Sequence, residues 1–243
     1  MIEAKRRPVQ WSRARVETVR NRDAGLPQAP LYPLAKRWVD ISCAAVLLLL
    51  LSPVLGMIAL AIRMDSSGPA IFQQRRVGKW GREFVMYKFR SMYANADDKV
   101  HRRFAKEYIN GNGKVHAAHD SNLNAPVYKP NGDGRITRVG RWLRRTSLDE
   151  LPQLLNVVRG EMSLVGPRPA VPYEVEQYSR RHLRRLAVLP GLTGLAQISG
   201  RSGLTFEKIV RLDIDYIDRR SLGLDLAILL RTVPVVVQAK CSA

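Results

Sequence analysis

The sequence has few cysteines, few histidines and few acidic residues. Its two cysteines, Cys43 and Cys241, cannot frame a disulfide scaffold or supply a four-ligand zinc site. The four histidines show no H-E-x-x-H spacing, which argues against a zinc hydrolase. Aspartate and glutamate number 21 against 40 lysines and arginines, so the 243 residues carry a formal net charge of +19. The sequence therefore excludes a small secreted cystine-rich protein and indicates an anionic partner: a nucleic acid, an anionic lipid or a phosphorylated substrate.

Apolar residues, in contrast, are plentiful. They make up 46% of the chain, which is ordinary for a folded protein and too many for a disordered one. The length allows one domain or at most two. Residues 1–35 contain several basic residues and few apolar periodic positions, so we interpret them as a basic N-terminal tail, either lying on a surface or loosely ordered.

Residues 41–62 form a run of 22 residues without a charge. A straight helix of that length would extend about 33 Å and could cross a bilayer core as a single transmembrane helix. Ser52 and Pro53 stand in the middle of the run. Proline cannot donate its backbone hydrogen bond and clashes with the carbonyl four residues back, so the helix should kink there. Each arm then covers about half of the hydrocarbon core, and a bent helix could enter one leaflet and return.

The residues that flank this run favour the bent alternative. Basic flanks favour the cytoplasmic side of a membrane, and here both flanks are basic, with Lys36 and Arg37 before the run and Arg63, Arg75 and Arg76 after it. We therefore expect a membrane-embedded, re-entrant helix-break-helix over residues 36–66. A signal peptide fits poorly, because the apolar run starts about 40 residues in and is longer than the usual apolar region of such peptides.

The remaining residues, 67–243, predict a cytoplasmic domain of the α+β class that is mainly helical and contains a small β-hairpin. Two β-prone runs around Gly78-Lys79-Trp80-Gly81 predict the hairpin over 70–90. Asn, Gly, Asp and Pro are frequent in a variable loop over about 99–134. Apolar spacing ended by Gly160 predicts a helix from Leu148. Further helices are expected over 173–188, 206–219 and 222–239, the last of them interfacial or packed.

Asp149 and Glu150 are adjacent carboxylates at the start of a predicted helix, and two interpretations of them are open. Ser147-x-x-Glu150 matches a capping box, and acidic residues suit the positive end of a helix dipole. Pro152 complicates this interpretation, because a helix capped by Ser147 would place Pro152 just beyond the positions whose N–H groups are free. In the other interpretation the pair performs chemistry, since phosphate binds well at a helix N-terminus.

Basic residues near Pro/Gly turns strengthen the chemical interpretation. A single arginine is usually a solvated surface residue, but guanidinium groups also match phosphate oxygens in bidentate fashion. A carboxylate among cations stays ionised, and aspartate is a known phosphate-accepting nucleophile. An Asp-Glu pair with Mg²⁺ and arginine can carry out phosphoryl transfer. The candidate phosphate-binding residues are Arg144, Lys88, Arg90, Arg168 and Arg201.

Several motifs follow one another along the chain from about Lys36 to Val237. They are K-R-W-V-D, the Ser52-Pro53 break, F-Q-Q-R-R-V-G-K, Y-K-F-R-S-M, R-W-L-R-R-T-S-L-D-E-L-P-Q, S-L-V-G-P-R-P and P-G-L-T-G-L-A-Q-I-S-G-R. Each motif alone is weak evidence, whereas the combination in this order is highly specific. It resembles the bacterial sugar transferases, the monotopic polyprenyl-phosphate phosphoglycosyl transferases.

This resemblance implies an enzyme at the cytoplasmic face of the bacterial inner membrane. It would move a sugar-1-phosphate from a nucleotide-diphosphate sugar, most often a UDP-sugar, to undecaprenyl phosphate and release the nucleoside monophosphate. Asp149 would attack the sugar-bearing phosphorus, and Glu150 would share Mg²⁺ with it. Arg144, Lys88, Arg90 and Arg168 would line the phosphate pocket, and the re-entrant helix would fall on residues 41–62.

Two departures from the family pattern are Asp133-Gly134-Arg135, where the family often has Asp-Pro-Arg, and the long stretch over about 99–134. No further apolar segment precedes residue 36, so we expect a catalytic core with a short basic tail. Anionic lipid is an expected partner, nucleic acid is not, and the apolar segments are compatible with a homodimer. A membrane-tethered nucleic-acid- or lipid-binding protein without catalysis is the alternative. No residue identifies the sugar.

Overall fold

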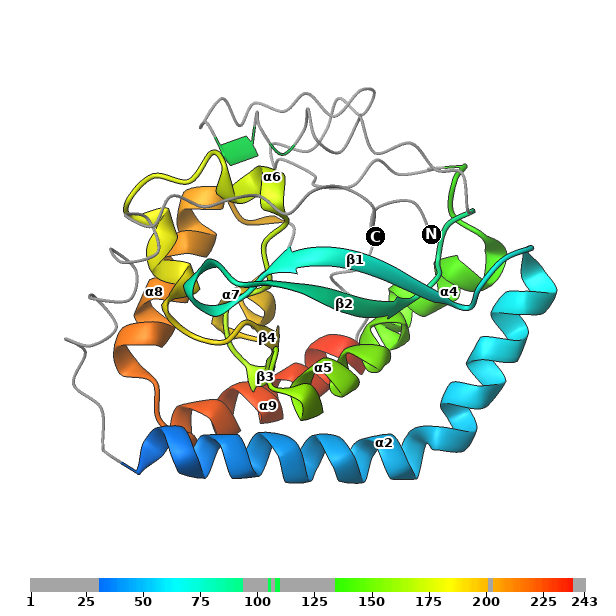
Figure 1. Ribbon diagram of the computed structural model, residues 1–243, viewed down its shortest axis with the longest axis horizontal. Coiled ribbons are helices and arrows are strands. Elements are labelled where there is room, and N and C mark those ends of the chain that lie inside the picture. Colours follow the sequence, from blue (N-terminus) through cyan, green and yellow to red (C-terminus); the bar gives the residue numbers. More distant parts are fainter. Residues whose placement is uncertain (1–30, 94–104, 106–107, 110–133, 201–202, 238–243) are drawn as a thin grey trace.

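The computed structural model describes residues 31–93, 105, 108–109, 134–200 and 203–237 (Figure 1). The predicted tail lies almost wholly outside these residues, as does most of the 99–134 loop. The described part mixes helices with two small sheets, in agreement with the predicted α+β class. Its elements, with 3-10 helices written η, are α2 (Tyr32–Asp65), β1 (Ile71–Val77), η2 (Lys79–Gly81), β2 (Glu83–Phe89), α4 (Arg138–Thr146), η3 (Leu148–Gln153), α5 (Leu154–Arg159), β3 (Ser163–Val165), α6 (Pro172–Val175), η4 (His182–Ala187), β4 (Gly191–Thr193), α7 (Leu195–Ile198), α8 (Phe206–Arg219) and α9 (Leu222–Val237).

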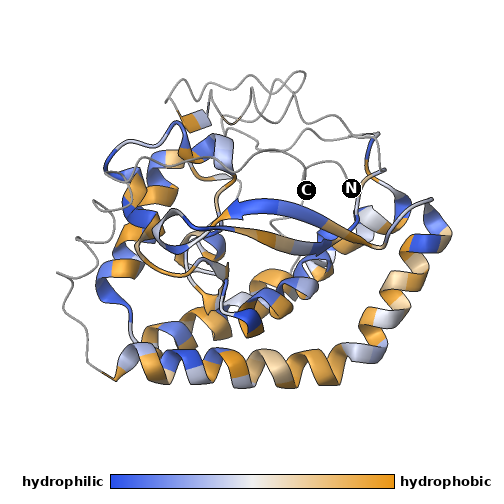
Figure 2. Ribbon diagram, in the orientation of Figure 1, coloured by the Kyte–Doolittle hydropathy of each residue, from blue (hydrophilic) through white to orange (hydrophobic). Residues whose placement is uncertain are grey.

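Helix α2 is long and apolar, and it changes direction partway along its length (Figures 1 and 2). Pro53 lies inside it, and the Ser52 hydroxyl donates to the Leu49 carbonyl at 2.8 Å. A missing backbone donor together with a side chain that bonds the preceding turn accounts for such a bend. Within the described residues α2 is the one helix long and apolar enough to cross a membrane.

Both arms of α2 pack against the same folded body, and its middle is exposed. Ala44 in the first arm is buried in a cluster with Leu154. Ile62 in the second arm is buried in another cluster with Leu143. Between these two anchors Leu49 is 75% exposed. The helix therefore presents apolar side chains outward where it bends, while both of its arms contact the protein.

Polar contacts attach both ends of α2 as well. At the start, the Tyr32 hydroxyl donates to the Asp225 carboxylate at 3.1 Å, and Lys36 Nζ lies 2.9 Å from the same carboxylate. At the end, Arg90 Nη2 donates to the Ser66 carbonyl at 2.6 Å. Asp225 belongs to α9 and Arg90 follows β2 directly. The two ends of α2 are thus held by elements of one domain.

The predicted hairpin is confirmed. Strands β1 and β2 pair antiparallel from Ile71↔Phe89 to Val77↔Glu83, and the turn between them is Gly78 to Gly81. Trp80 in this turn has φ of 57° and Gly81 has φ of 78°, which are left-handed conformations that suit a tight connection. The register sets the face of the hairpin to which each side chain of the two strands points.

A second sheet, formed by β3 and β4, was not predicted. The two strands pair parallel, with Ser163 opposite Gly191 and Val165 opposite Thr193. Glycine is required at Gly191 because a Cβ there would lie 2.1 Å from the Gly166 nitrogen. This close approach brings the chain after β3, which contains Arg168, against the start of β4.

Two predicted helices differ from the structure. The helix expected from Leu148 begins as the 3-10 helix η3 and becomes α-helical only at Leu154, because Pro152 has no N–H with which to continue an α-helical ladder. The helix expected over 173–188 is two short pieces, α6 and η4. Ser179 and His182 hydrogen-bond each other between them, at 3.3 Å, and this local bonding replaces the helical pattern.

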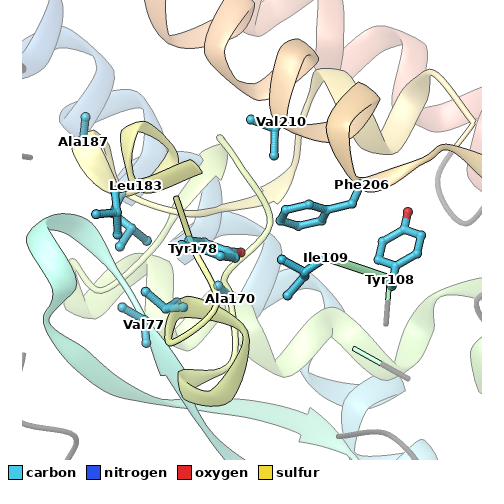
Figure 3. Packing of buried hydrophobic residues seen from close by; sticks show 11 residues of the cluster. Val77, Tyr108, Ile109, Ala170, Tyr178, Leu183, Ala187, Phe206 and Val210 are labelled. Carbon is cyan, nitrogen blue, oxygen red and sulfur yellow. The ribbon is translucent and has the colours of Figure 1, made fainter. Parts of the chain in front are cut away.

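The helices predicted over 206–219 and 222–239 are confirmed as α8 and α9, although residues 238–239 lie outside the described part. Figure 3 shows the core beneath α8, where Phe206 and Val210 meet residues of η4, of the segment before it and of the hairpin. Arg185 and Asp213 form a buried ion pair of 2.7 Å beside this core. The core thus joins the hairpin to the C-terminal helices.

Core packing on α5 gives a stability prediction. Leu154 is 1% exposed and packs in the cluster that holds the first arm of α2, whereas its neighbour Leu155 is 37% exposed. Leu154→Ala should lower the free energy of unfolding by about 2–5 kcal/mol, because it leaves a cavity. Leu155→Ala should cost less than about 1 kcal/mol. Denaturant unfolding of the detergent-solubilised variants measures both, and equal losses would contradict the packing described here.

Candidate active site

The Glu150 carboxylate lies between two cations that come from distant parts of the sequence. Lys88 Nζ donates to Glu150 Oε1 at 3.1 Å, and Arg168 Nη1 lies 3.8 Å from the same oxygen. Lys88 is on β2, Glu150 is on η3, and Arg168 follows β3. The structure therefore brings together three of the residues that the sequence singled out.

The backbone at Ser147 sets the direction of the carboxylate pair. Ser147 ends α4 and precedes η3 with φ of 57°, a left-handed conformation, and its side chain forms no capping hydrogen bond. The capping-box interpretation of Ser147-x-x-Glu150 is therefore wrong. Asp149 and Glu150 occupy the first turn of η3, and both are partly buried.

Burial dominates the electrostatics of Lys88. Removal from water lowers the pKa of Lys88 below its ordinary value, and the carboxylate of Glu150 opposes that shift. Arg168 and Arg76 lower this pKa further, while Asp149 raises it. Two guanidinium groups thus lie close enough to repel the charged form of Lys88, and the Asp149–Glu150 pair offsets part of that repulsion. Such a cluster is suited to an anion that carries more than one charge.

The loop around Arg168 is held on two sides. On one side Arg76 Nη1 donates to the Pro169 carbonyl at 2.8 Å, and Val77 N donates to the Ala170 carbonyl at 2.9 Å. On the other side Gly191 N donates to the Pro167 carbonyl at 2.8 Å. The Arg168 backbone is fixed between these bonds, while the Arg168 side chain is 52% exposed and can reach a ligand.

Arg76 was missed as a site residue by the sequence analysis. It is 8% exposed, its Nε and Nη2 donate to Gln74 Oε1 at 3.1 and 2.6 Å, and it supports the loop that carries Arg168. The signal was present in the alternation of the strand. Successive side chains point to opposite faces, so of the adjacent pair Arg75–Arg76 one must face inward.

The other predicted phosphate ligands have different surroundings. Arg90 is 5% exposed and donates to carbonyl groups at the end of α2. Arg144 Nε donates to the Ser91 hydroxyl at 2.9 Å. Arg201 lies outside the described residues. Ser52 and Pro53 are exposed at the bend of α2. A phosphate-binding role for Arg90, Arg144 and Arg201 stays a prediction.

The carboxylate pair is also the predicted magnesium site. No group of three or more histidine, cysteine, aspartate or glutamate side chains that could hold a metal occurs in the described part of the chain. Mg²⁺ does not need three such side chains, since it is commonly bound through one or two carboxylates, with water and substrate phosphates as its other ligands. Asp149 and Glu150 fit that donor set, because hard oxygen ligands occur here beside cations that would hold a phosphate.

Comparison with known proteins finds a family profile and individual relatives that match most of this chain. The sequence profile of the bacterial sugar transferases matches residues 31–239. A galactosyl transferase, CpsE, of Streptococcus agalactiae is 44% identical over 84% of this chain and 42% of its own length. The Escherichia coli UDP-glucose:undecaprenyl-phosphate glucose-1-phosphate transferase is 40% identical over 86% of this chain and 43% of its own. The exopolysaccharide production protein ExoY of Rhizobium meliloti is 39% identical over 85% of this chain and 87% of its own length.

The chain thus spans less than half of the length of two of these relatives and most of the length of the third. The aligned part includes both carboxylates and the cations around them, because the family profile runs from before α2 to the end of α9.

The support that Arg76 gives to the loop is testable. Arg76→Ala leaves the Pro169 carbonyl without this donor in a buried place, and we expect it to lower the free energy of unfolding by about 1–3 kcal/mol. Hydrogen exchange over residues 166–171 should become faster. The control is Arg75→Ala, which removes a part-buried 3.5 Å ion pair with Glu83 and should cost about 0–1 kcal/mol. Unchanged exchange in Arg76→Ala would contradict the assigned support.

Proposed function

Because the chain belongs to the bacterial sugar transferase family, we propose that it transfers a sugar-1-phosphate from a nucleotide-diphosphate sugar to undecaprenyl phosphate. The observation that supports this best is the Glu150 carboxylate between Lys88 and Arg168. Relatives named undecaprenyl-phosphate glucose and galactose phosphotransferases have the same type of reaction in their names. The reaction would be the first membrane step in the synthesis of a surface polysaccharide.

In the proposed first step, Asp149 acts as the nucleophile. A carboxylate oxygen of Asp149 forms a bond to the phosphorus that bears the sugar. The bond from that phosphorus to the bridging oxygen breaks, and the nucleoside monophosphate, UMP for a UDP-sugar, leaves with the electron pair. In the second step a phosphate oxygen of undecaprenyl phosphate attacks the aspartyl phosphosugar, and Asp149 is regenerated.

The cations of the site would bind the charged groups in both steps. Arg168 and Lys88 would contact the diphosphate of the donor, where fixed donors stabilise charge that develops in the transition state. Mg²⁺ held by Asp149 and Glu150 would supply further neutralisation of phosphate charge. A phosphate beside Lys88 would also favour the charged form of its side chain, against the effect of burial.

A lipid acceptor requires a site at the membrane surface, and the attachments of α2 support a re-entrant arrangement. Tyr32 at one end is bonded to α9, and Ser66 at the other end is bonded to Arg90. A helix whose two ends are attached to one domain cannot leave them on opposite sides of a bilayer. The exposed apolar bend would enter one leaflet, and the basic flanks would keep the domain at the cytoplasmic face of the inner membrane.

Helix α9 adds an apolar surface beside α2. Leu226, Leu230 and Val233 are 57–64% exposed and share one face, while Ile228 on the opposite face is buried. This division is that of an interfacial helix, and with the net charge of +19 it suits an anionic leaflet. A homodimer stays a prediction.

The reaction is tested by UMP release from a panel of UDP-sugars, with and without undecaprenyl phosphate and Mg²⁺. Release that depends on all components would identify the sugar. Asp149→Asn should reduce turnover at least about a thousandfold, because an amide cannot replace the carboxylate nucleophile. The control Asp215→Asn removes a surface carboxylate of α8, paired with Arg219 at 3.5 Å, and should retain turnover. Normal turnover by Asp149→Asn would exclude Asp149 as the nucleophile.

The re-entrant arrangement is tested by Pro53→Ala. Alanine restores the backbone donor, so α2 should straighten. In part of the population Tyr32 and Lys36 should then separate from Asp225, and the N-terminus should cross the membrane. A single cysteine at Ser12, in a protein whose Cys43 and Cys241 are replaced by serine, can be labelled in intact cells with an impermeant maleimide. Labelling should rise in Pro53→Ala and not in the control Met57→Ala. Unchanged labelling would show that Pro53 does not decide the topology.

A further inference from the structure

The outer edge of β2 is bonded by a side chain instead of a third strand. Asn156 Nδ2 donates to the Val85 carbonyl at 2.7 Å, and Tyr87 N donates to Asn156 Oδ1 at 3.1 Å. These are two backbone groups on one edge of the strand, the groups that a neighbouring strand would otherwise bond. The side-chain amide of Asn156 therefore bonds both backbone groups at this edge of β2, and Asn156 is fully buried.

Asn156 also forms hydrogen bonds with the residues that follow it on its own segment. Its Nδ2 donates to Glu161 Oε2 at 2.7 Å, and its backbone carbonyl accepts from Glu161 N at 3.0 Å and Met162 N at 3.2 Å. The amide orientation follows from these partners, because Nδ2 faces two acceptors and Oδ1 faces a donor. An amide is the one side-chain group of this size that satisfies all three.

The elements that Asn156 joins are the elements that carry the two halves of the site. Asn156 belongs to α5, which continues directly from η3 and its carboxylates. Tyr87, which Asn156 binds, is followed by Lys88. The hydrogen bond from Lys88 to Glu150 joins β2 to η3, whereas the bonds of Asn156 join β2 to α5. Glu150 lies six residues before Asn156, and Lys88 lies one residue after Tyr87.

We propose that Asn156 is a positioning residue, which holds β2 against η3 and α5 so that Lys88 reaches Glu150 and the phosphate of the donor. This inference deepens the proposed function and rests on it for its effect on turnover. Asn156 itself touches no reacting atom. A side chain with a structural role alone could be an apolar residue of similar volume, since a buried amide contributes little unless every polar atom is paired.

The test uses Asn156→Asp in the full-length protein. Aspartate keeps the oxygen that accepts from Tyr87 N, but its second oxygen faces the Val85 carbonyl and the Glu161 carboxylate, both acceptors. The strand should separate from the helix at this point. We expect faster hydrogen exchange over residues 83–89, at least a tenfold lower kcat for UMP release, and a change in the donor KM of less than threefold, because Arg168 still binds the diphosphate.

A second variant separates this role from a loss of folding. Asn156→Asp combined with Glu161→Gln gives the new carboxylate a donor, and we expect kcat and the exchange protection to recover in part. The matched control is Ser221→Ala, which removes the hydroxyl that accepts from Leu224 N at the start of α9 and lowers stability without touching β2. It should retain kcat below its unfolding temperature.

The outcomes distinguish the inference from the proposed function. Folded Asn156→Asp with unchanged exchange over 83–89, or with kcat within twofold of the unmodified protein, would overturn the positioning role. No recovery in the double variant would overturn it as well. Failure of the unmodified protein to release a nucleotide from any donor would contradict the proposed function, and exchange over 83–89 would still decide whether Asn156 holds the strand.

Discussion

The two sheets in the described part of the chain are too small to be stable by themselves, and the architecture around them depends on how their edges are bonded. A two-stranded sheet is marginal in water, and it leaves two rows of unpaired backbone groups. At β2 one edge is bonded by Asn156 from α5. At β3 the Leu164 N–H is bonded by Asp40 from α2, a carboxylate that is 3% exposed. Side chains of helices therefore replace the strands that a larger sheet would provide.

This arrangement connects the apolar helix to the candidate site. Asp40 and Lys36 lie one turn apart on α2, and Lys36 also contacts Asp225 of α9. Tyr216 of α8 donates to Asp225 at 2.8 Å, and its hydroxyl also lies 3.0 Å from the Val165 carbonyl at the end of β3. The loop with Arg168 begins at the next residue. The position of α2 is thus connected to the loop with Arg168 through a few buried polar contacts, as the proposed lipid acceptor would require.

Local signals predicted the elements that local interactions determine. The turn around Trp80, the stop at Gly160 and the helix over 206–219 each depend on residues close in sequence, and each was predicted. The β3–β4 pair was not, because three-residue parallel strands have no alternation to detect and form through distant contacts. Asn156 and Arg76 were missed for the same reason. Their partners lie 71 and 93 residues away, so only the folded chain shows that they support the site.

The charges of the site explain why it needs such support. Burial disfavours the charged form of Lys88, and Arg168 and Arg76 repel it, so the pKa of the Lys88 side chain is lowered. Without a neighbouring carboxylate and fixed backbone segments, these cationic side chains would separate and become solvated. Here the Glu150 carboxylate attracts two of them, and the backbone bonds of Arg76 and Asn156 hold the segments that carry them. These hydrogen bonds therefore hold together the segments that carry a concentrated positive charge, as the proposed phosphate site would require.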